Sequence, residues 1–312
     1  MASNQPSVFI DGEAGTTGLG IRQRLEAMPG IGLRSIPAAQ RKDPSARQDM
    51  MAECDLVVLC LPDDAARDAV ALAGALGSDA PRLLDASTAH RVDPEWTYGF
   101  PEMAPDQADR IAASAKVTNP GCYPTGAIGL LRPLIQAGLV APDYPITINA
   151  VSGYSGGGRS IIEAHDQDGG PAFELYALGL EHKHVPEIER FAGLSRRPIF
   201  VPSVGHFRQG MLVSVPLYLD DLPGKPTGAD LCEALRAFYE GSEYVAIAAG
   251  NGQSTLEPES LNDTNRLELY VWANEARRHG VLVARLDNLG KGASGAALQN
   301  LRLMLDLGPR SN

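Results

Sequence analysis

The fold of the first part of the chain is decided by the stretch Ser7-Val8-Phe9-Ile10-Asp11-Gly12-Glu13-Ala14-Gly15-Thr16-Thr17-Gly18. Its first five residues are typical of a buried strand, and Leu19, Arg22 and Leu25 follow at helical spacing. A strand, a glycine turn and a helix in this order predict a unit in which the backbone approaches a pyrophosphate. The spacing is G-x-x-G-x-x-G rather than G-x-G-x-x-G, so a tight turn without a ligand is the alternative.

A second strand is predicted at Leu33-Arg34-Ser35-Ile36. The acidic residue that usually ends this strand in NAD-binding units is missing. Ser35, Arg41 and Lys42 occupy the region instead, which suits a 2′-phosphate and favours NADP(H) as coenzyme. The alternative is that these basic residues are simply solvated in an exposed loop.

Two further buried strands are predicted at 55–61 and 82–85, and one of the aspartates at 63–64 is expected to cap the helix between them. Strands that alternate with helices predict a doubly wound parallel sheet, whose ligands lie beyond the carboxyl ends of the strands. Ser87 and Arg91 follow the fourth strand and are expected at that edge. Arg91 is either an anion ligand or a partner in a surface salt bridge.

Cys122 lies where a short strand at 116–118 gives way to a helix, on a turn that Pro120 and Gly121 make tight. The N–H groups and the positive dipole end of a helix favour a thiolate, and they can also hold a developing oxyanion. This position predicts a nucleophile. A buried structural cysteine is the alternative.

The pattern changes after this helix. A strand at 146–151 leads into a loop at 152–159 that is rich in serine and glycine and ends in Arg159. Such a loop can bring N–H groups and a cation to a phosphate or carboxylate, or it can be a flexible connection. A largely antiparallel sheet in an α+β segment is expected from the following alternating stretches, the last two joined by a hairpin at 274–280: 199–219, Phe238, 244–248, 267–272 and 281–286.

Two histidines, His182 and His184, stand two residues apart, and a strand would point both to one side. No cysteine cluster and no third histidine lies near them in sequence, so a metal site is not expected. One histidine that activates Cys122 and moves protons is the better use of the pair. His206 competes for that role.

A chain of 312 residues is long enough for two domains. Its composition, 44 % hydrophobic and 21 % charged, is that of an ordinary soluble protein. The net charge of −11 argues against nucleic acid as a partner, but local arginines can still bind an anionic substrate. No apolar run is long enough for a membrane span, and residues 1–6 do not resemble a signal peptide. The four cysteines are far apart, which favours a reducing cytoplasm.

Taken together, the chain resembles the N-acetyl-gamma-glutamyl-phosphate reductases of the shorter form, in the aspartate-semialdehyde dehydrogenase superfamily. The resemblance spans essentially the whole chain. It rests on four stretches: Tyr98-Gly99-Phe100-Pro101-Glu102, Asn119-Pro120-Gly121-Cys122-Tyr123-Pro124-Thr125, His182-Lys183-His184-x-Pro186-Glu187-Ile188 and Asp287-Asn288-Leu289-Gly290-Lys291-Gly292-Ala293. One departure is Ala89-His90-Arg91, where longer members have Asp-Phe-Arg.

The resemblance implies NADPH-dependent reduction of N-acetyl-glutamyl 5-phosphate to the 5-semialdehyde, with phosphate release, in arginine biosynthesis. Cys122 would be the nucleophile and His184 the general acid/base. The substrate-binding candidates are Arg91, Tyr176, His182, Arg159 and His206. The coenzyme-binding candidates are Gly12, Gly15, Thr16, Thr17, Gly18, Ser35, Arg41, Ser87, Ser155, Gly156, Gly157, Gly158 and Asn288.

We therefore expect a Rossmann-like domain at 1–121, with a C-terminal helix at 289–312 packing back on it. A catalytic and dimerisation domain is expected at 122–288, in a homodimer or homotetramer. Two alternatives stay open. One is an aspartate-semialdehyde dehydrogenase, and the other is a non-catalytic NADP-binding regulator that uses Cys122 as a redox sensor.

Overall fold

The computed structural model describes residues 5–248 and 254–308. The chain divides into two compact units, one made of Met1–Pro120 with Ala293–Asn312 and the other of Gly121–Gly292. Each unit has its own sheet. In the part of the chain that the structure describes, no helix is both long and apolar enough to cross a membrane.

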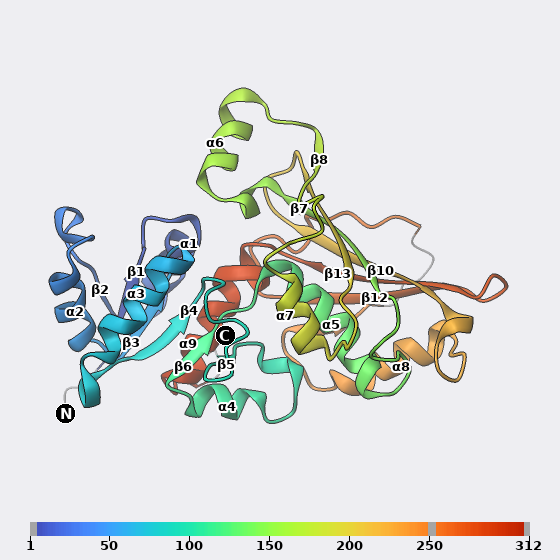
Figure 1. The fold of residues 1–312 in the computed structure, drawn as a ribbon, viewed down its shortest axis with the longest axis horizontal. Helices are drawn as coiled ribbons and strands as arrows, with labels where there is room; N and C mark the ends of the chain where they lie inside the picture. Colours follow the sequence, from blue (N-terminus) through green and yellow to red (C-terminus); the bar gives the residue numbers. More distant parts are fainter. Residues whose placement is uncertain (1–4, 249–253, 309–312) are drawn as a thin grey trace. The chain divides into compact units, whose positions relative to one another are not determined.

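The first unit is built on a parallel sheet with the strand order β2-β1-β3-β4-β6-β5 (Figure 1). Its strands are β1 (Ser7–Asp11), β2 (Gly32–Arg34), β3 (Leu56–Leu59), β4 (Arg82–Asp85), β5 (Thr97–Tyr98) and β6 (Lys116–Thr118). Its helices are α1 (Thr16–Glu26), α2 (Pro44–Ala52), α3 (Asp63–Gly74), α4 (Gln107–Ala113) and α9 (Gly295–Met304).

Alternate residues of these strands feed two separate cores, one on each face of the sheet. Val8 and Ile10 of β1 pack with apolar side chains of α1, α4 and α9, whereas Phe9 packs with those of α2 and α3. Helices on both faces of a parallel sheet are the doubly wound arrangement that the sequence predicted, and this prediction is confirmed.

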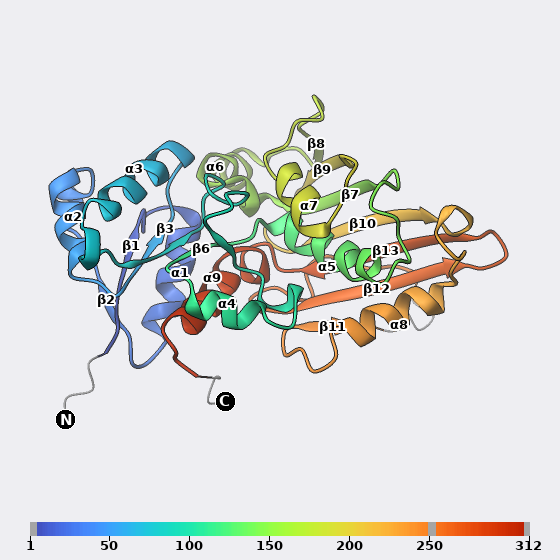
Figure 2. The ribbon, with the colours of Figure 1, turned by 60° about the horizontal axis from the view of Figure 1, so that its bottom comes forward.

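The second unit is built on a mixed sheet with the strand order β11-β12-β13-β10-β7-β9-β8 (Figure 2). Its strands are β7 (Thr147–Gly153), β8 (Phe173–Leu175), β9 (Ile199–Gly205), β10 (Met211–Tyr218), β11 (Val245–Ile247), β12 (Leu267–Asn274) and β13 (His279–Leu286). Its helices are α5 (Cys122–Gln136), α6 (Arg159–Asp168), α7 (Val185–Ala192) and α8 (Gly228–Phe238). Only the β7–β9 and β11–β12 pairings are parallel, so the expectation of a largely antiparallel sheet is confirmed.

Close packing of α5 on this sheet depends on small residues. A Cβ added at Gly126 would lie 2.9 Å from Val213 and 3.2 Å from Ala284, so β10 and β13 turn these side chains toward the helix. The alternate residues Leu212 and Val283 therefore belong to the opposite face, which we call the open face.

Three local predictions were wrong. Phe238 ends α8 rather than joining the sheet, because Thr227 and Asp230 form a capping box that starts a helix there. Pro62, not an aspartate, occupies the N-cap position of α3, and the Asp63 carboxylate accepts hydrogen bonds from Thr88 instead. The loop at 152–159 forms the end of β7 and a 3₁₀ turn before α6.

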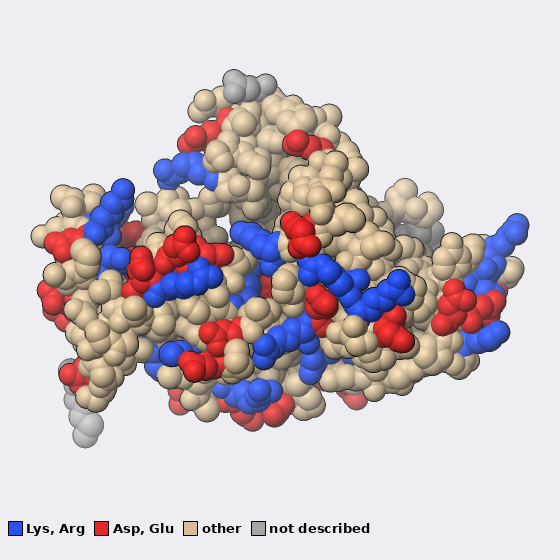
Figure 3. Space-filling model, viewed as in Figure 1, with Lys and Arg blue, Asp and Glu red and all other residues tan. Residues whose placement is uncertain are grey.

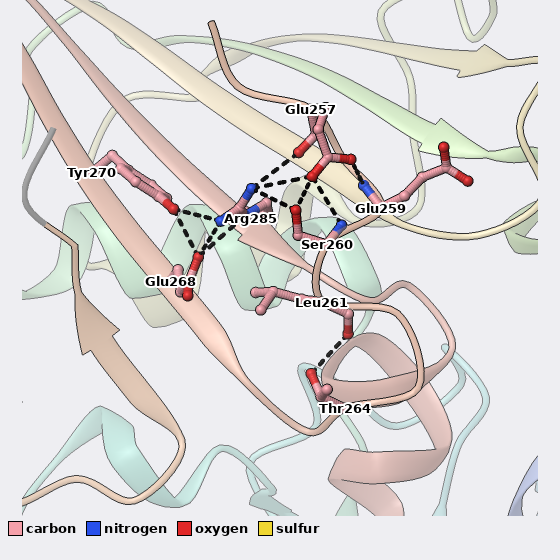
Figure 4. Close-up of polar contacts among 8 residues, drawn as sticks. All are labelled: Glu257, Glu259, Ser260, Leu261, Thr264, Glu268, Tyr270 and Arg285. Carbon is pink, nitrogen blue, oxygen red and sulfur yellow. Dashed lines mark hydrogen bonds and ion pairs between the residues drawn. The ribbon is translucent and has the colours of Figure 1, made fainter. Parts of the chain in front are cut away.

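A polar cluster on the open face joins β12 to β13 (Figure 4). Arg285 donates to the Glu268 carboxylate at 2.6 Å and to the Tyr270 hydroxyl at 2.7 Å, and Tyr270 donates to the same carboxylate at 2.7 Å. Burial opposes the charged form of Glu268, but hydrogen bonds from Arg285 and Tyr270 outweigh it and hold the pKa of this carboxyl below its ordinary value.

Glu268→Gln should lower the free energy of unfolding by about 1–3 kcal/mol at pH 7, because it removes the negative charge from the acceptor that Arg285 and Tyr270 share. A carboxyl whose folded pKa is depressed stabilises the fold above its unfolded pKa and loses that effect as pH falls through the folded value. The difference between wild type and variant should therefore be largest above about pH 4.3, the ordinary pKa of a glutamate, and shrink as pH falls below it. Urea unfolding across pH measures it, and the exposed Glu259→Gln serves as control. A difference that stays constant as pH falls from 7 to 3 would contradict this account.

Candidate active site and coenzyme site

Cys122 is the first residue of α5, a helix of 15 residues. The N-cap residue is Gly121, and no acidic residue stands in the first turn, so the helix terminus offers its N–H groups and dipole to the sulfur. The thiol is partly exposed. In contrast, burial raises the pKa of the Cys54 thiol to about 11 and raises that of Cys60 as well, which makes both poor nucleophiles.

Two further residues fix the turn that holds Cys122. The Glu187 carboxylate, only 1 % exposed on α7, accepts a hydrogen bond of 2.8 Å from the Gly121 N–H. Gly292 lies against the cysteine, because a Cβ there would come 2.8 Å from the Cys122 Cβ. Both residues belong to motif stretches of the sequence, but neither was predicted to have a role. Glu187 follows His184 by three residues, a spacing that brings two helical side chains to the same face. This spacing was the signal that could have indicated a role for Glu187.

The histidine pair and Tyr176 gather around Tyr123, the residue that follows Cys122. The rings of His182 and His184 are 4.8 Å apart, and Tyr123 lies about equally far from both, at 6.0 and 5.9 Å. Tyr176 donates a hydrogen bond of 3.1 Å to the Tyr123 hydroxyl. Burial raises the pKa of Tyr176 to about 12, and its interaction with Cys122 acts in the same direction, so the phenol is a neutral donor at pH 7.

His206 is placed in a different cluster of the same unit. Its Nδ1 lies 2.9 Å from the Nδ1 of His165, and the ring of His165 stacks on Tyr154 with centroids 4.5 Å apart. One nitrogen of the pair must donate and the other accept. The structure thus brings His182 and His184, but not His206, into the ring cluster of Tyr123.

The serine- and glycine-rich segment lies next to the start of the last motif. Asn288 donates from its amide to the Ser155 hydroxyl at 2.9 Å and accepts from the Gly210 N–H at 2.8 Å. Gly156 packs against the same amide, since a Cβ would lie 3.3 Å from its nitrogen. Gly157 and Gly158 complete the turn, and Arg159 is the exposed first residue of α6.

In the first unit, the glycine turn between β1 and α1 leaves no room for side chains. Gly12 has φ +93°, and a Cβ there would lie 2.3 Å from the Cys60 carbonyl oxygen. A Cβ on Gly18 would lie 2.5 Å from the Gly12 carbonyl oxygen. Gly15 is the N-cap of α1, which opens with Thr16 and Thr17, and among the described residues no side chain caps this end. A pyrophosphate fits such a terminus.

Gly12→Ala should destabilise the protein by more than about 2 kcal/mol. The left-handed backbone is strained for alanine, and the added methyl group would clash with the carbonyl oxygen of Cys60. Gly74→Ala, near the end of α3 with open space around its Cα, is the matched control and should be neutral or stabilising by about 0.5–1 kcal/mol. Urea unfolding of both variants measures the difference. Equal stability of the two would contradict the packing described here.

A cavity of about 430 Å³ lies beside this turn in the first unit. Ser35 and Arg41 line it, together with Arg22 and Glu13. Arg41 donates to the Glu13 carboxylate at 2.6 Å and the Ser35 hydroxyl donates to it at 2.9 Å. Arg22 forms a further ion pair with the same carboxylate. No role was predicted for Glu13. Its contact with Ser35 forms only when the turn is folded against β2.

Ser87 and Arg91 belong to a buried polar segment after β4. Ser87 donates to the Asp85 carboxylate at 2.9 Å, and Arg91, 8 % exposed, donates to the carbonyl oxygens of Asn119 and Ala86 at 3.1 Å each. His90 also contacts Asp85, with 2.6 Å between its Nδ1 and the carboxylate, and it stacks on Trp96. These contacts fix the segment that carries Arg91.

Comparison with known proteins identifies the family. The chain is 52 % identical to N-acetyl-gamma-glutamyl-phosphate reductase of Burkholderia cenocepacia over 307 residues, which cover 96 % of this chain and 97 % of the relative. It is also 52 % identical over 310 residues to N-acetyl-gamma-glutamyl-phosphate reductase 2 of Pseudomonas putida, with the same coverage.

The chain belongs to the N-acetyl-gamma-glutamyl-phosphate reductase family.

Domain models and solved structures agree with this family. Residues 122–288 match the model "Semialdehyde dehydrogenase, dimerisation domain", and residues 37–111 match "Semialdehyde dehydrogenase, NAD binding domain". Aspartate semialdehyde dehydrogenase from Francisella tularensis superposes with a TM-score of 0.73 at 13 % identity, over 96 % of this chain and 100 % of that chain. The enzyme from Candida albicans, in complex with NADP, gives 0.69 at 14 % identity, over 96 % and 98 %. At such identity the likeness to the sister enzymes shows the fold alone.

Family membership confirms the resemblance that the motifs of the sequence indicated. It also favours the reductase over the alternative of an aspartate-semialdehyde dehydrogenase. A relative of this identity over nearly the whole chain carries the reductase name, whereas the aspartate-semialdehyde dehydrogenases match only as folds. In the described part of the chain, no group of three or more His, Cys, Asp or Glu side chains is arranged to hold a metal ion.

Proposed function

We propose that the chain catalyses the NADPH-dependent reduction of N-acetyl-glutamyl 5-phosphate to N-acetyl-glutamate 5-semialdehyde and phosphate, a step of arginine biosynthesis. The observation that carries the proposal is the placement of Cys122 at the start of α5, beside the cluster of Tyr123, Tyr176, His182 and His184. The names of the close relatives support the substrate.

The first half-reaction is acyl transfer. His184 takes the thiol proton of Cys122, and the thiolate attacks the carbonyl carbon of the acyl phosphate. The helix N-terminus stabilises the negative charge that develops on the carbonyl oxygen. The C–O bond to phosphate breaks, phosphate leaves with the electron pair and a proton from the imidazolium, and a thioester on Cys122 remains.

Reduction of the thioester is the second half-reaction, for which bound NADPH supplies the hydride. The chain's own groups hold the acyl carbon and manage the proton. His184, which gave its first proton to phosphate, takes up a second one from solvent and places it on the oxygen of the thiohemiacetal. It takes this proton back as the C–S bond breaks, which releases the aldehyde and leaves a thiolate beside the imidazolium. Tyr176 and His182 orient the substrate, as do Arg91 and Arg159, whose guanidinium groups suit its carboxylate and phosphate.

In the first unit, the coenzyme would bind along the glycine turn. In the second unit, the Ser155–Gly158 turn and Asn288 are the coenzyme-binding candidates. The steric demands at Gly12 and Gly18 fit a pyrophosphate, and Arg22, Ser35 and Arg41 fit a 2′-phosphate. On the face shown in Figure 3, Lys and Arg side chains are interspersed with Asp and Glu, so local groups of arginines would attract the anion there.

A test of the covalent route omits the coenzyme. The protein is mixed rapidly with N-acetyl-glutamyl 5-phosphate, and phosphate release is followed. A burst of about one phosphate per Cys122, followed by slow release, is the expected result, because the thioester accumulates when no hydride is available. Absence of the burst from protein that reduces the same substrate with NADPH would contradict the thioester route.

We further propose a cytoplasmic homodimer that pairs through the open face of the seven-stranded sheet, with a homotetramer as a possible larger assembly. The match to a dimerisation domain and the apolar residues Leu212, Pro216, Val281 and Val283 on that face support the pairing. The four cysteines are free thiols, as a reducing compartment would keep them. Sedimentation velocity tests the assembly, and a monomer at micromolar concentration would contradict it.

A further inference from the structure

We propose that Glu13 is a built-in competitor of the coenzyme's 2′-phosphate and so sets how strongly the protein prefers NADPH over NADH. The inference rests on the coenzyme site proposed above. Glu13 is the second residue of the glycine turn and is 7 % exposed. An acidic side chain at this depth needs partners, and its carboxylate has three: Arg22, Ser35 and Arg41.

These three partners form the donor set that a phosphate monoester requires. Two guanidinium groups and a hydroxyl converge on one anion, and Arg22 also donates to the Ser35 hydroxyl at 2.9 Å, which fixes the set as a unit. All four residues line the same cavity of about 430 Å³. The Glu13 carboxylate thus takes the place among these donors that the 2′-phosphate would take.

The Glu13 carboxylate and the 2′-phosphate compete for the two arginines because of their charges. Arg22 and Arg41 carry two positive charges, and Glu13 already neutralises one of them. A 2′-phosphate brings roughly −1.5 to −2 at pH 7, so phosphate and Glu13 together exceed the positive charge of the two arginines. Binding of the phosphorylated coenzyme must therefore displace the carboxylate, whereas NADH, which lacks that phosphate, makes no such demand.

Direct binding of adenosine nucleotides tests the proposal without any turnover. Titration calorimetry compares 2′,5′-ADP with 5′-ADP, which lacks the 2′-phosphate, on the full chain. Glu13→Gln, which keeps the shape of the side chain and removes its charge, should tighten 2′,5′-ADP about tenfold and change 5′-ADP by less than about twofold. Arg41→Met should weaken 2′,5′-ADP about tenfold or more.

Glu26→Gln is the matched control. Glu26 pairs with the same Arg22, at 2.9 Å, but it is exposed and does not line the cavity, so its loss should leave both affinities unchanged. Weaker or unchanged binding of 2′,5′-ADP to folded Glu13→Gln would overturn the proposal, because Glu13 would then only orient the arginines. Failure of wild type to bind either nucleotide would overturn the coenzyme site itself, while a change caused by Glu26→Gln would show a long-range charge effect and also overturn the competition.

Discussion

Replacement of Cys122 by serine should lower the rate of reduction by about 10⁴-fold or more while the affinity for NADPH stays within about twofold of wild type. The hydroxyl is a far weaker nucleophile than a thiolate at a helix N-terminus, so no thioester forms. The coenzyme contacts proposed in the first unit do not involve this residue. Steady-state assays and fluorescence titration with NADPH measure the two quantities.

A matched control for this variant is Cys232→Ser. Cys232 lies in the second turn of α8 rather than at its first residue, and its replacement should leave the rate within about threefold of wild type. Residual activity of Cys122→Ser above about one per cent would contradict covalent catalysis at this position. Loss of NADPH binding in the same variant would contradict the division of labour between the two units.

Replacement of His184 by asparagine should lower the rate of reduction by about 10²–10⁴-fold, the range expected for loss of a general acid/base. The variant should also lose the pH dependence that an imidazole gives to the rate near neutrality. Asparagine keeps a polar group of similar size at a position that is 7 % exposed, which limits the damage to packing. Rate measurements from pH 5 to 9 test both expectations.

His206→Asn distinguishes the two histidines that the sequence left in competition. His206 is exposed and paired with His165, so this variant should keep the rate within about tenfold and retain the wild-type pH profile. If His206→Asn abolished the pH dependence and His184→Asn did not, the assignment of the proton carrier would move to His206.

Local patterns were sufficient to predict much of the fold. The strand and glycine turn of Ser7–Gly18 and the hairpin at 274–280 carry their signals in consecutive residues, through hydrophobic alternation and turn chemistry. The helix α6 was missed because its sequence is polar and follows three glycines, which reads as a loop. Phe238 was misplaced because its aromatic ring suggested a strand, although the capping box eleven residues earlier determines the helix.

In the candidate site too, features with a local sequence signal were predicted and long-range contacts were not. Position at a strand–helix junction was enough to select Cys122 from four cysteines, since that signal is local. The contacts of Glu13 with Ser35 and of Glu187 with Gly121 join residues 22 and 66 positions apart, and no spacing rule predicts such pairs. Tertiary structure alone shows which donors surround these two carboxylates.

The most direct test of the central claim runs the reaction in the direction of acyl phosphate formation. N-acetyl-glutamate semialdehyde, phosphate and NADP⁺ are mixed with the protein, and NADPH absorbance is followed. Aspartate semialdehyde and NAD⁺ serve as parallel controls. We predict NADPH formation that depends on phosphate and occurs with the acetylated glutamate aldehyde. NADPH formation with aspartate semialdehyde alone, or none with either aldehyde from folded protein that binds NADPH, would contradict the proposed function.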